Sequence, residues 1–530
     1  MHLNTKVQKY FLITSSIIIL TSYLYSSYLY SGNKIIFFIF FLSIHIYLII
    51  AFFFSDLFFD KVLSTFLWLG FYLTIFFKIT LNITRIIEGE GNFKFLPDQF
   101  DKVLIYSTVG FIGFTLSSLF HSSFINIKKL KNVDNFRLIE FYNKYKNKII
   151  FIFFLLIVSI NFYNFKFEIY QKGLIALTSI HPFLSIILKF FIIFGLTAIS
   201  TLLIDYENKS KNKVTFLILL IFYFEITLTN TVLLSRSYIF LGGFILLATL
   251  ISHKTKGGDY YNSFIFNIIF LFFTFLINVQ FIETLRDSKY FDKNFVINEL
   301  KKNYANKKSV DSKNLNLSVV KPKEKIVEPV KPKEKIASTL SDEIKLKEKI
   351  IDKRFADSKV FYNRIKKIIF LVQNRFVGFE ALAIVTHSNN QSSNTFWNSF
   401  NEKINFNGNA SYYSANLMNR KDNSIERQSE RQISVYLPGI IAFCAYHGSL
   451  LFLFFSIFFV HLIAGVIEKS ALVFSYNCKV FSCFIGFVLA YRLIHFGYVP
   501  NNSYMLLGAI LLTIFAIFIL SKTILKLSKE

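Results

Sequence analysis

The sequence predicts an all-α, polytopic integral membrane protein of about twelve transmembrane helices with one large hydrophilic loop on the outer face of the membrane. Two observations lead to this prediction. Of the 530 residues, 53% are hydrophobic, 68 are Phe, and the mean hydropathy is +0.47. Apolar runs of about 18 or more residues recur along most of the chain, and each is long enough to cross about 30 Å of hydrocarbon.

The apolar runs divide the chain into nine spans before the large loop and three after it. The stretch 122–148, which separates the fourth and fifth spans, is expected to be a loop. The expected spans lie near residues 10–30, 34–55, 61–83, 102–121, 149–165, 183–204, 214–234, 237–252, 263–281, 437–463, 480–497 and 504–522.

Lysines in the short segments set the orientation of these spans. Cytoplasmic loops carry an excess of Lys and Arg. With twelve spans, the basic segments 122–148 and 205–213 and the basic C-terminal tail fall on the same side as Lys6 and Lys9. We therefore expect a bacterial inner-membrane protein with both termini in the cytoplasm and a periplasmic loop between the ninth and tenth spans.

The chain is expected to contain two membrane domains, at 1–281 and 437–530, separated by the periplasmic loop at 282–436. Within the loop, residues 301–353 repeat the sequence Lys-Pro-Lys-Glu-Lys-Ile and lack the apolar content that a fold requires, which predicts a disordered spacer. Residues 355–436 are expected to be partly ordered. Apolar residues at helical spacing over 360–385 predict amphipathic helices on the membrane surface, and 386–432 reads as a carbohydrate-contacting or merely solvated loop.

Composition argues against several classes of function. The net charge of +26 comes mainly from lysines between spans, which set topology, so nucleic acid is not expected as a partner. The cysteines, Cys444, Cys478 and Cys483, lie outside the large loop and have no metal-binding spacing. Motifs for nucleotide hydrolysis, serine hydrolysis and zinc proteolysis are missing. We expect neither a metal nor a cofactor.

Arginine is the most informative residue type. Only 11 of the 59 basic residues are Arg, and by the expected topology all except Arg137 lie outside or at the outer boundary of the membrane. Arg offers a planar, bidentate donor to phosphate or carboxylate, which Lys does not. An alternative is that outer loops escape the pressure for cytoplasmic Lys, and the sequence leaves both explanations open.

Four residues are the candidates for catalysis. Arg236 lies in a very short turn between two spans, where a charge is costly unless it is paired or faces a polar cavity. Arg375 lies in the large loop, five residues before Glu380. Glu380 and His387 are candidate bases for activating a hydroxyl group.

Three further residues are the candidates for binding substrate: Arg492, His495 and Arg286. Arg492 and His495 are three residues apart near the outer end of one span and should share a helix face. Arg492 suits an anionic head group, and His495 suits proton relay, although a structural pair is an alternative.

These features together resemble the Wzy-type polymerases of lipid-linked O-antigen and capsule polysaccharides, and the related O-antigen ligases. The resemblance covers nearly the whole chain at the level of topology. Locally it is confined to the Ser-Arg-Ser turn at 235–237, the Arg375–Glu380 segment, and the stretch 438–449. A glycine that follows the arginine in some of these polymerases is replaced here by Leu247 and Thr386.

The resemblance implies that the substrate is a glycan on undecaprenyl diphosphate, in contact with membrane lipid and with a chain-length regulator as a further partner. Arg236 and Arg375 would clamp the diphosphate leaving group, and His387 or Glu380 would accept the hydroxyl proton. Ligase-like glycan transfer and a non-enzymatic flippase or transporter are the alternatives. A metal-dependent lipid-sugar glycosyltransferase is disfavoured because the first outer loop, residues 31–33, carries no acidic residue.

Overall fold

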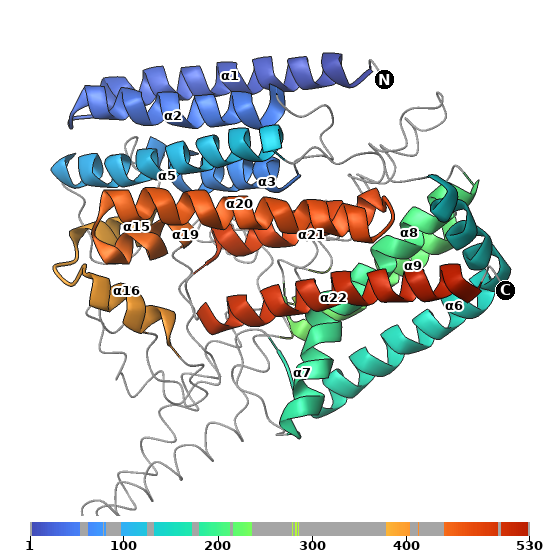
Figure 1. Ribbon diagram of the computed structural model, residues 1–530. Coiled ribbons are helices and arrows are strands. Elements are labelled where there is room, and N and C mark those ends of the chain that lie inside the picture. The colour runs from blue at the N-terminus through green and yellow to red at the C-terminus, as the bar shows by residue number, and fades with distance from the viewer. Residues whose placement is uncertain are drawn as a thin grey trace, which may run out of the picture.

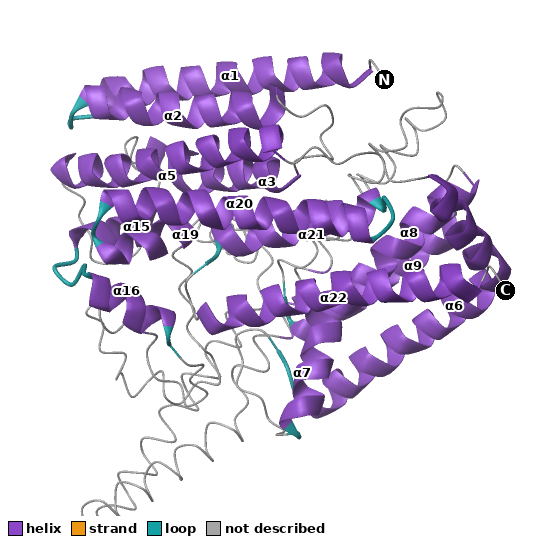
Figure 2. Cartoon of the chain, in the orientation of Figure 1, coloured by secondary structure: helices purple, strands orange, loops and turns teal. Residues whose placement is uncertain are grey.

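A computed structural model of the chain describes residues 3–53, 62–77, 79–80, 97–124, 132–171, 180–211, 216–235, 378–402, 439–496 and 500–527, with five isolated positions, Asn278, Phe281, Ile282, Leu285 and Tyr412. Every regular element in these ranges is a helix (Figure 2). The all-α prediction is confirmed for this part of the chain. The expected spacer at 301–353 lies outside the described residues.

The helices of the first half fall into two antiparallel series. The first comprises α1 (Leu3–Leu29), α2 (Lys34–Phe53), α3 (Val62–Phe71) with its π-helical extension η1 (Tyr72–Phe77), and α5 (Pro97–Phe124). The second comprises α6 (Asn132–Phe167), α7 (Pro182–Phe190), the π-helical η2 (Phe191–Gly195), α8 (Leu196–Lys211) and α9 (Phe216–Leu233).

The second half contributes short and long helices. The short ones are α15 (Gly378–His387), α16 (Ser393–Phe400), α19 (Gly439–Cys444) and the 3₁₀ turn η4 (Ala445–His447). The long ones are α20 (Leu450–Phe474), α21 (Lys479–Ile494) and α22 (Pro500–Leu527).

Several of these helices are long and apolar enough to cross a membrane. Five meet this description among the described residues, within Phe100–His121, Arg137–Phe167, Phe183–Ser210, Leu450–Phe474 and Ser503–Lys526. Shorter apolar helices occupy Lys34–Ile50, Val62–Phe77 and Leu217–Leu233. The protein is therefore a multi-pass membrane protein, and its twelve spans and their orientation stay predictions.

The two chain termini lie at one end of the long helices, and α15 and α16 lie at the other (Figure 1). We call the end that carries α15 and α16 the distal end. Helices α20 and α21 run between α5 and α3 on one side and α22 on the other. This places α20 and α21, from the second half of the chain, between the first helices and α22.

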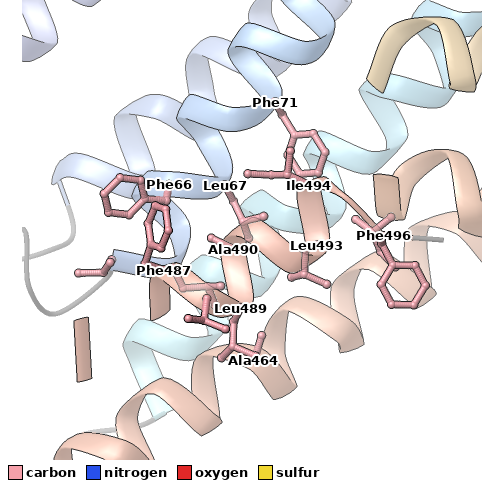
Figure 3. Packing of buried hydrophobic residues seen from close by; sticks show 14 of the residues in the cluster. Phe66, Leu67, Phe71, Ala464, Phe487, Leu489, Ala490, Leu493, Ile494 and Phe496 are labelled. Carbon is pink, nitrogen blue, oxygen red and sulfur yellow. The ribbon is translucent and has the colours of Figure 1, made fainter. Parts of the chain in front are cut away.

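Close packing of apolar side chains joins α3 to α21 and α20 (Figure 3). The rings of Phe66 and Phe487 meet edge to face with centroids 4.8 Å apart. Leu67, Ala464 and Ala490 are buried in the same layer. Small side chains allow helix backbones to approach in a membrane, where van der Waals packing is a main source of helix association.

Buried polar side chains also join these helices. His461 on α20 lies 2.9 Å from Ser117 Oγ through Nδ1 and 3.2 Å from Ser64 Oγ through Nε2. Glu468, which is also on α20, accepts a hydrogen bond from the Leu63 backbone N–H at 3.1 Å. These contacts fix the relative rotation of α3, α5 and α20, since a polar group left unpartnered in hydrocarbon is costly.

Two expected helix boundaries were wrong. The segment 122–148 is not a loop throughout, because α6 begins at Asn132. Its polar first half is stabilised by contacts with α8, where Glu207 accepts hydrogen bonds from Lys146 Nζ at 2.6 Å and Tyr142 Oη at 3.1 Å. The expected span at 437–463 instead begins at Leu450 and ends at Phe474. Gly448 has a φ of +82° and Ser449 caps the new helix through Phe452 N–H, so α19 cannot continue into α20.

The expectation of surface helices over 360–385 was also wrong where the structure describes it. Residues Gly378–Thr386 of α15 are all buried, and α15 packs against α5, α19 and η1. The Phe379 ring stacks on Phe100 of α5 with centroids 5.5 Å apart. A buried helix is typically apolar on all sides, whereas a surface helix is apolar on one side only. The segment 386–432, which was expected to be a loop, contains the helix α16. Ser392 caps the N-terminus of α16 by accepting a hydrogen bond from the Thr395 N–H at 3.1 Å.

Candidate functional site

Arg492 lies in the last turn of α21 at the distal end, and its side chain is partly buried. Its Nε donates a hydrogen bond to Ser503 Oγ on α22 at 2.8 Å. The two terminal nitrogens of the guanidinium make no hydrogen bond with the described residues, and none of those residues forms an ion pair with it. Among the described residues the side chain is thus held through Nε alone, and its two terminal nitrogens form the edge that can donate to a bidentate ligand.

Tyr170 lies beside Arg492, just after the end of α6. The Asn164 side chain holds the Tyr170 backbone by two hydrogen bonds of 2.9 Å, one to its N–H and one to its carbonyl. Burial raises the pKa of the Tyr170 phenol, and the positive charge of Arg492 partly opposes this shift. Lys189 on α7 lies over the Tyr170 ring, with Nζ 5.5 Å from the ring centroid. Two cations from different helices therefore gather around one aromatic side chain.

Gln171, the next residue, is buried, and neither its Oε1 nor its Nε2 has a hydrogen-bond partner among the described residues. A buried amide with no partner costs stability unless a ligand or water meets it. We call Tyr170, Gln171, Lys189 and Arg492 the cationic group.

His495 caps the end of α21 and turns back toward the helix. Its Nδ1 lies 3.1 Å from the Tyr491 carbonyl, and its ring is 4.4 Å from the Tyr491 ring centroid. His495 is the residue at which α21 ends, with a φ of −108° and a ψ of 34°, and it lies at the same end of the helix as Arg492. The contact with Tyr491 is of the kind that a structural residue makes.

Glu380 and His387 lie on α15, at the distal end. Glu380 is only 2% exposed, so it is not a solvated loop residue. His387 is partly buried, and its Nδ1 lies 2.8 Å from the Ala383 carbonyl oxygen. A carbonyl oxygen can only accept, so Nδ1 carries the proton, and the lone pair is on Nε2.

Burial lowers the pKa of His387 below its ordinary value of 6.5. The Ala383 carbonyl opposes this shift, and the positive charge of Lys102 on α5 adds to it. His387 is therefore neutral at pH 7 and presents a basic nitrogen. This arrangement can accept a proton from a hydroxyl group.

The short helix α19 joins the two parts of the distal end. It packs against α15 on one side and α21 on the other. The Gly439 N–H donates to the Phe496 carbonyl at 2.8 Å, directly beyond His495, and Phe443 meets the Phe496 ring with centroids 4.9 Å apart. The Phe400 ring of α16 contacts Tyr504, the neighbour of Ser503, with centroids 5.0 Å apart. Thus α19 packs against α21, and α16 packs against the beginning of α22.

Three of the candidate residues, Arg236, Arg375 and Arg286, lie outside the described residues. The described residues just before Arg236 and Arg286 pack against one another. Leu234 and Ile282 are buried in one small cluster, and Leu285 packs against it. Arg236 follows Leu234 by two residues in the sequence, and Arg286 directly follows Leu285.

The structure identifies residues that the sequence did not single out. Tyr170 follows a polar end of α6, and no spacing links it to Arg492, 322 positions later, in the sequence. Gln171 carries no motif either. The signal that was present is Lys189, an unusual charge in an apolar run.

Comparisons with models of known protein families, with curated proteins and with solved structures found no match to this chain. The function must therefore be argued from the geometry at the distal end.

Proposed function

We propose that the protein polymerises oligosaccharide repeat units carried on undecaprenyl diphosphate, at the periplasmic face of the inner membrane. The observation that supports this best is the cationic group. It brings Arg492 and Lys189 to one aromatic side chain, Tyr170, and among the described residues the terminal guanidinium nitrogens of Arg492 have no hydrogen-bond partner. This group lies at the end of the membrane helices where a lipid diphosphate would lie.

The proposed reaction is the transfer of a glycan from its lipid diphosphate to a sugar hydroxyl of a second lipid-linked unit. The hydroxyl oxygen forms a bond to the anomeric carbon, and the bond from that carbon to the diphosphate oxygen breaks. The hydroxyl proton passes to His387 Nε2, and the lipid diphosphate leaves with the bonding electrons. Arg492 and Lys189 stabilise the negative charge that develops on the leaving group.

Arg236 and Arg375 are the further arginines of the proposed site, as the resemblance to lipid-linked polysaccharide polymerases implies. Leu234, Ile282 and Leu285, which precede Arg236 and Arg286 in the sequence, pack together, and Arg375 precedes the buried helix α15 by three residues. A diphosphate needs several positive charges, and we propose that these arginines supply them together with Arg492.

Deletion of the protein in its native host, followed by analysis of lipid-linked glycans, tests this proposal. We expect single repeat units to accumulate on the outer leaflet. Full-length polymer that is not attached to its final acceptor would instead identify a ligase. Repeat units retained on the inner leaflet would identify a flippase.

One observation favours the flippase or transporter as a second candidate. Glu225 is fully buried near the middle of the apolar helix α9. Carboxylates at such depth are typical of ion and substrate pathways.

A further inference from the structure

A polar cluster lies between α6, α8 and α9, at some distance along the helices from the cationic group. Its centre is Glu225, which is fully buried. The Oε1 atom of Glu225 accepts hydrogen bonds from Thr197 Oγ1 on α8 and Thr229 Oγ1 on α9, each at 3.2 Å. These hydroxyl donors stabilise the ionised carboxylate, whereas burial in an apolar surrounding disfavours it unless a cation neutralises the charge.

Two acceptor atoms of this cluster have no donor within the described part of the chain. Glu225 Oε2 has no hydrogen-bond partner among the described residues, and neither has Asn161 Oδ1. Asn161 on α6 is fully buried, and its Nδ2 donates to Thr229 Oγ1 at 3.3 Å and to the Ile157 carbonyl at 3.0 Å. Buried oxygens without a donor destabilise a protein unless a positive partner is present.

The described cations do not supply that partner. Lys146 is paired with Glu207, which follows Thr197 by ten residues, or about 15 Å of helix. Lys189 precedes Thr197 by eight residues, or about 12 Å, and lies over Tyr170. Lys166 is exposed and lies over Phe167. Within the described part of the chain, only Thr197 and Thr229 interact polarly with the Glu225 carboxylate.

A small cavity lies one helical turn away from this cluster. The cavity, of about 10 Å³ between the same three helices, is lined by Ser200, whose Oγ is also buried without a described partner. The apolar side chains that line it are Phe153, Leu203, Ile218, Ile221 and Phe222. This volume is close to the smallest that can hold one water molecule.

We propose that Glu225, Thr197, Thr229 and Asn161 bind a sodium ion inside the membrane. Carboxylate, hydroxyl and amide oxygens are ligands that a hard cation prefers. One carboxylate balances one positive charge, whereas a divalent ion would leave a net charge in hydrocarbon. A sodium ion would supply a positive partner for the two oxygens that have no donor among the described residues. This site goes beyond the proposed glycan chemistry and does not depend on it.

Thermal unfolding of the purified full-length protein tests the site. Sodium chloride is titrated against choline chloride at constant ionic strength, because a ligand that binds the folded state raises the unfolding midpoint. We expect a saturable rise in sodium only. Thr229→Val should weaken the apparent sodium affinity by about tenfold or more, and Glu225→Gln should abolish the rise. Glu140→Gln, which removes an exposed carboxylate from α6, should leave it unchanged.

Equilibrium binding of radioactive sodium to the wild-type protein provides a second measurement that does not depend on any variant folding. We expect one ion per chain, displaced by unlabelled sodium and not by choline. The proposal is overturned if no sodium binds, or if Glu225→Gln binds it as well as the wild type. It is equally overturned if infrared difference spectra assign a protonated carboxyl to Glu225 in saturating sodium chloride.

Discussion

At the scale of single residues, Arg492 differs from a surface arginine in how its side chain is fixed. Ser503 binds its Nε at 2.8 Å, so that the planar group keeps one orientation before any ligand arrives. Lysine would retain the charge but has neither the Nε contact nor the second donor of a bidentate pair.

We therefore predict that Arg492→Lys reduces glycan transfer by about 10²-fold, as loss of a donor to developing negative charge typically does. The measurement is turnover of lipid-linked repeat units by the purified protein. Arg137→Lys on α6, at the opposite end of the expected membrane, is the matched control and should retain full activity. Wild-type turnover by Arg492→Lys would show that bidentate recognition is wrong.

If His387 is the base of the proposed reaction, the rate depends on pH in a defined direction. Its pKa is lowered below 6.5, so the neutral base is present above that pH and is lost as pH falls through the lowered value. Folding stability changes in the same direction. As pH falls from 6.5 through the lowered pKa, the unfolded chain binds a proton at His387 more readily than the folded protein does, so acidification reduces the free energy of unfolding. We predict a pH–rate profile whose acidic limb lies below 6.5.

Two variants test the assignment of that limb. His387→Gln should lower turnover by about 10²–10⁴-fold and remove the limb. Lys102→Gln removes a charge that lowers the His387 pKa, so the limb should move to higher pH while the maximal rate stays the same. If the acidic limb of the pH–rate profile stays at the same pH in Lys102→Gln, the limb belongs to a group other than His387.

At the scale of elements, hydropathy locates the apolar middle of a helix and not its ends. The polar first half of α6 reads as a loop because its stabilising partner, Glu207, is 61 residues from Lys146 in sequence. The start of α20 is set by the positive φ of Gly448 and the Ser449 cap, within a stretch that is apolar on both sides. The buried α15 reads as a surface helix because apolar spacing alone does not reveal which helices cover it.

Gly439 is required by the geometry of α19, and this gives a prediction about the element. Its φ is +82°, and a Cβ placed there would lie 2.8 Å from the Ile494 carbonyl oxygen. We predict that Gly439→Ala lowers the free energy of unfolding by about 1–3 kcal/mol, the cost of a strained backbone position. Chemical denaturation in detergent measures this.

Gly508 on α22 supplies the matched control for Gly439. A Cβ at Gly508 would meet nothing within 4 Å. Gly508→Ala should therefore be neutral or stabilise α22 by up to about 1 kcal/mol, from helix propensity alone. Equal destabilisation by both substitutions would argue against a special role for the Gly439 turn.

At the scale of the whole molecule, the order of helices along the chain follows from hydropathy, but their neighbours do not. Glu468 reaches the Leu63 backbone across 405 residues, and His461 reaches Ser64 across 397. Apolar spans resemble one another in sequence, so which pairs pack is decided by side-chain fit and a few polar contacts. For the same reason, Arg492 and His387 could be chosen as candidates from sequence, whereas the association of Arg492 with Tyr170 could not.

The arrangement of the ends leads to a final prediction about topology. Both termini lie at one end of the helices and α15 lies at the other (Figure 1). Lysines gather near the termini, which predicts that this end is cytoplasmic and that the distal end is periplasmic. Exposed positions at the two ends, Asn389 and Lys526, allow this to be tested with single cysteines.

In a background where Cys444, Cys478 and Cys483 are replaced by Ala, a membrane-impermeant maleimide should label Asn389→Cys in cells whose outer membrane alone is permeable. Lys526→Cys should react only after the inner membrane is opened. The native cysteines are all buried, so their removal should not alter the exposed ends. The reverse labelling pattern would place Arg492 and His387 on the cytoplasmic side. A glycan assembled on the outer leaflet could not reach them there, so the proposed reaction would have to be abandoned.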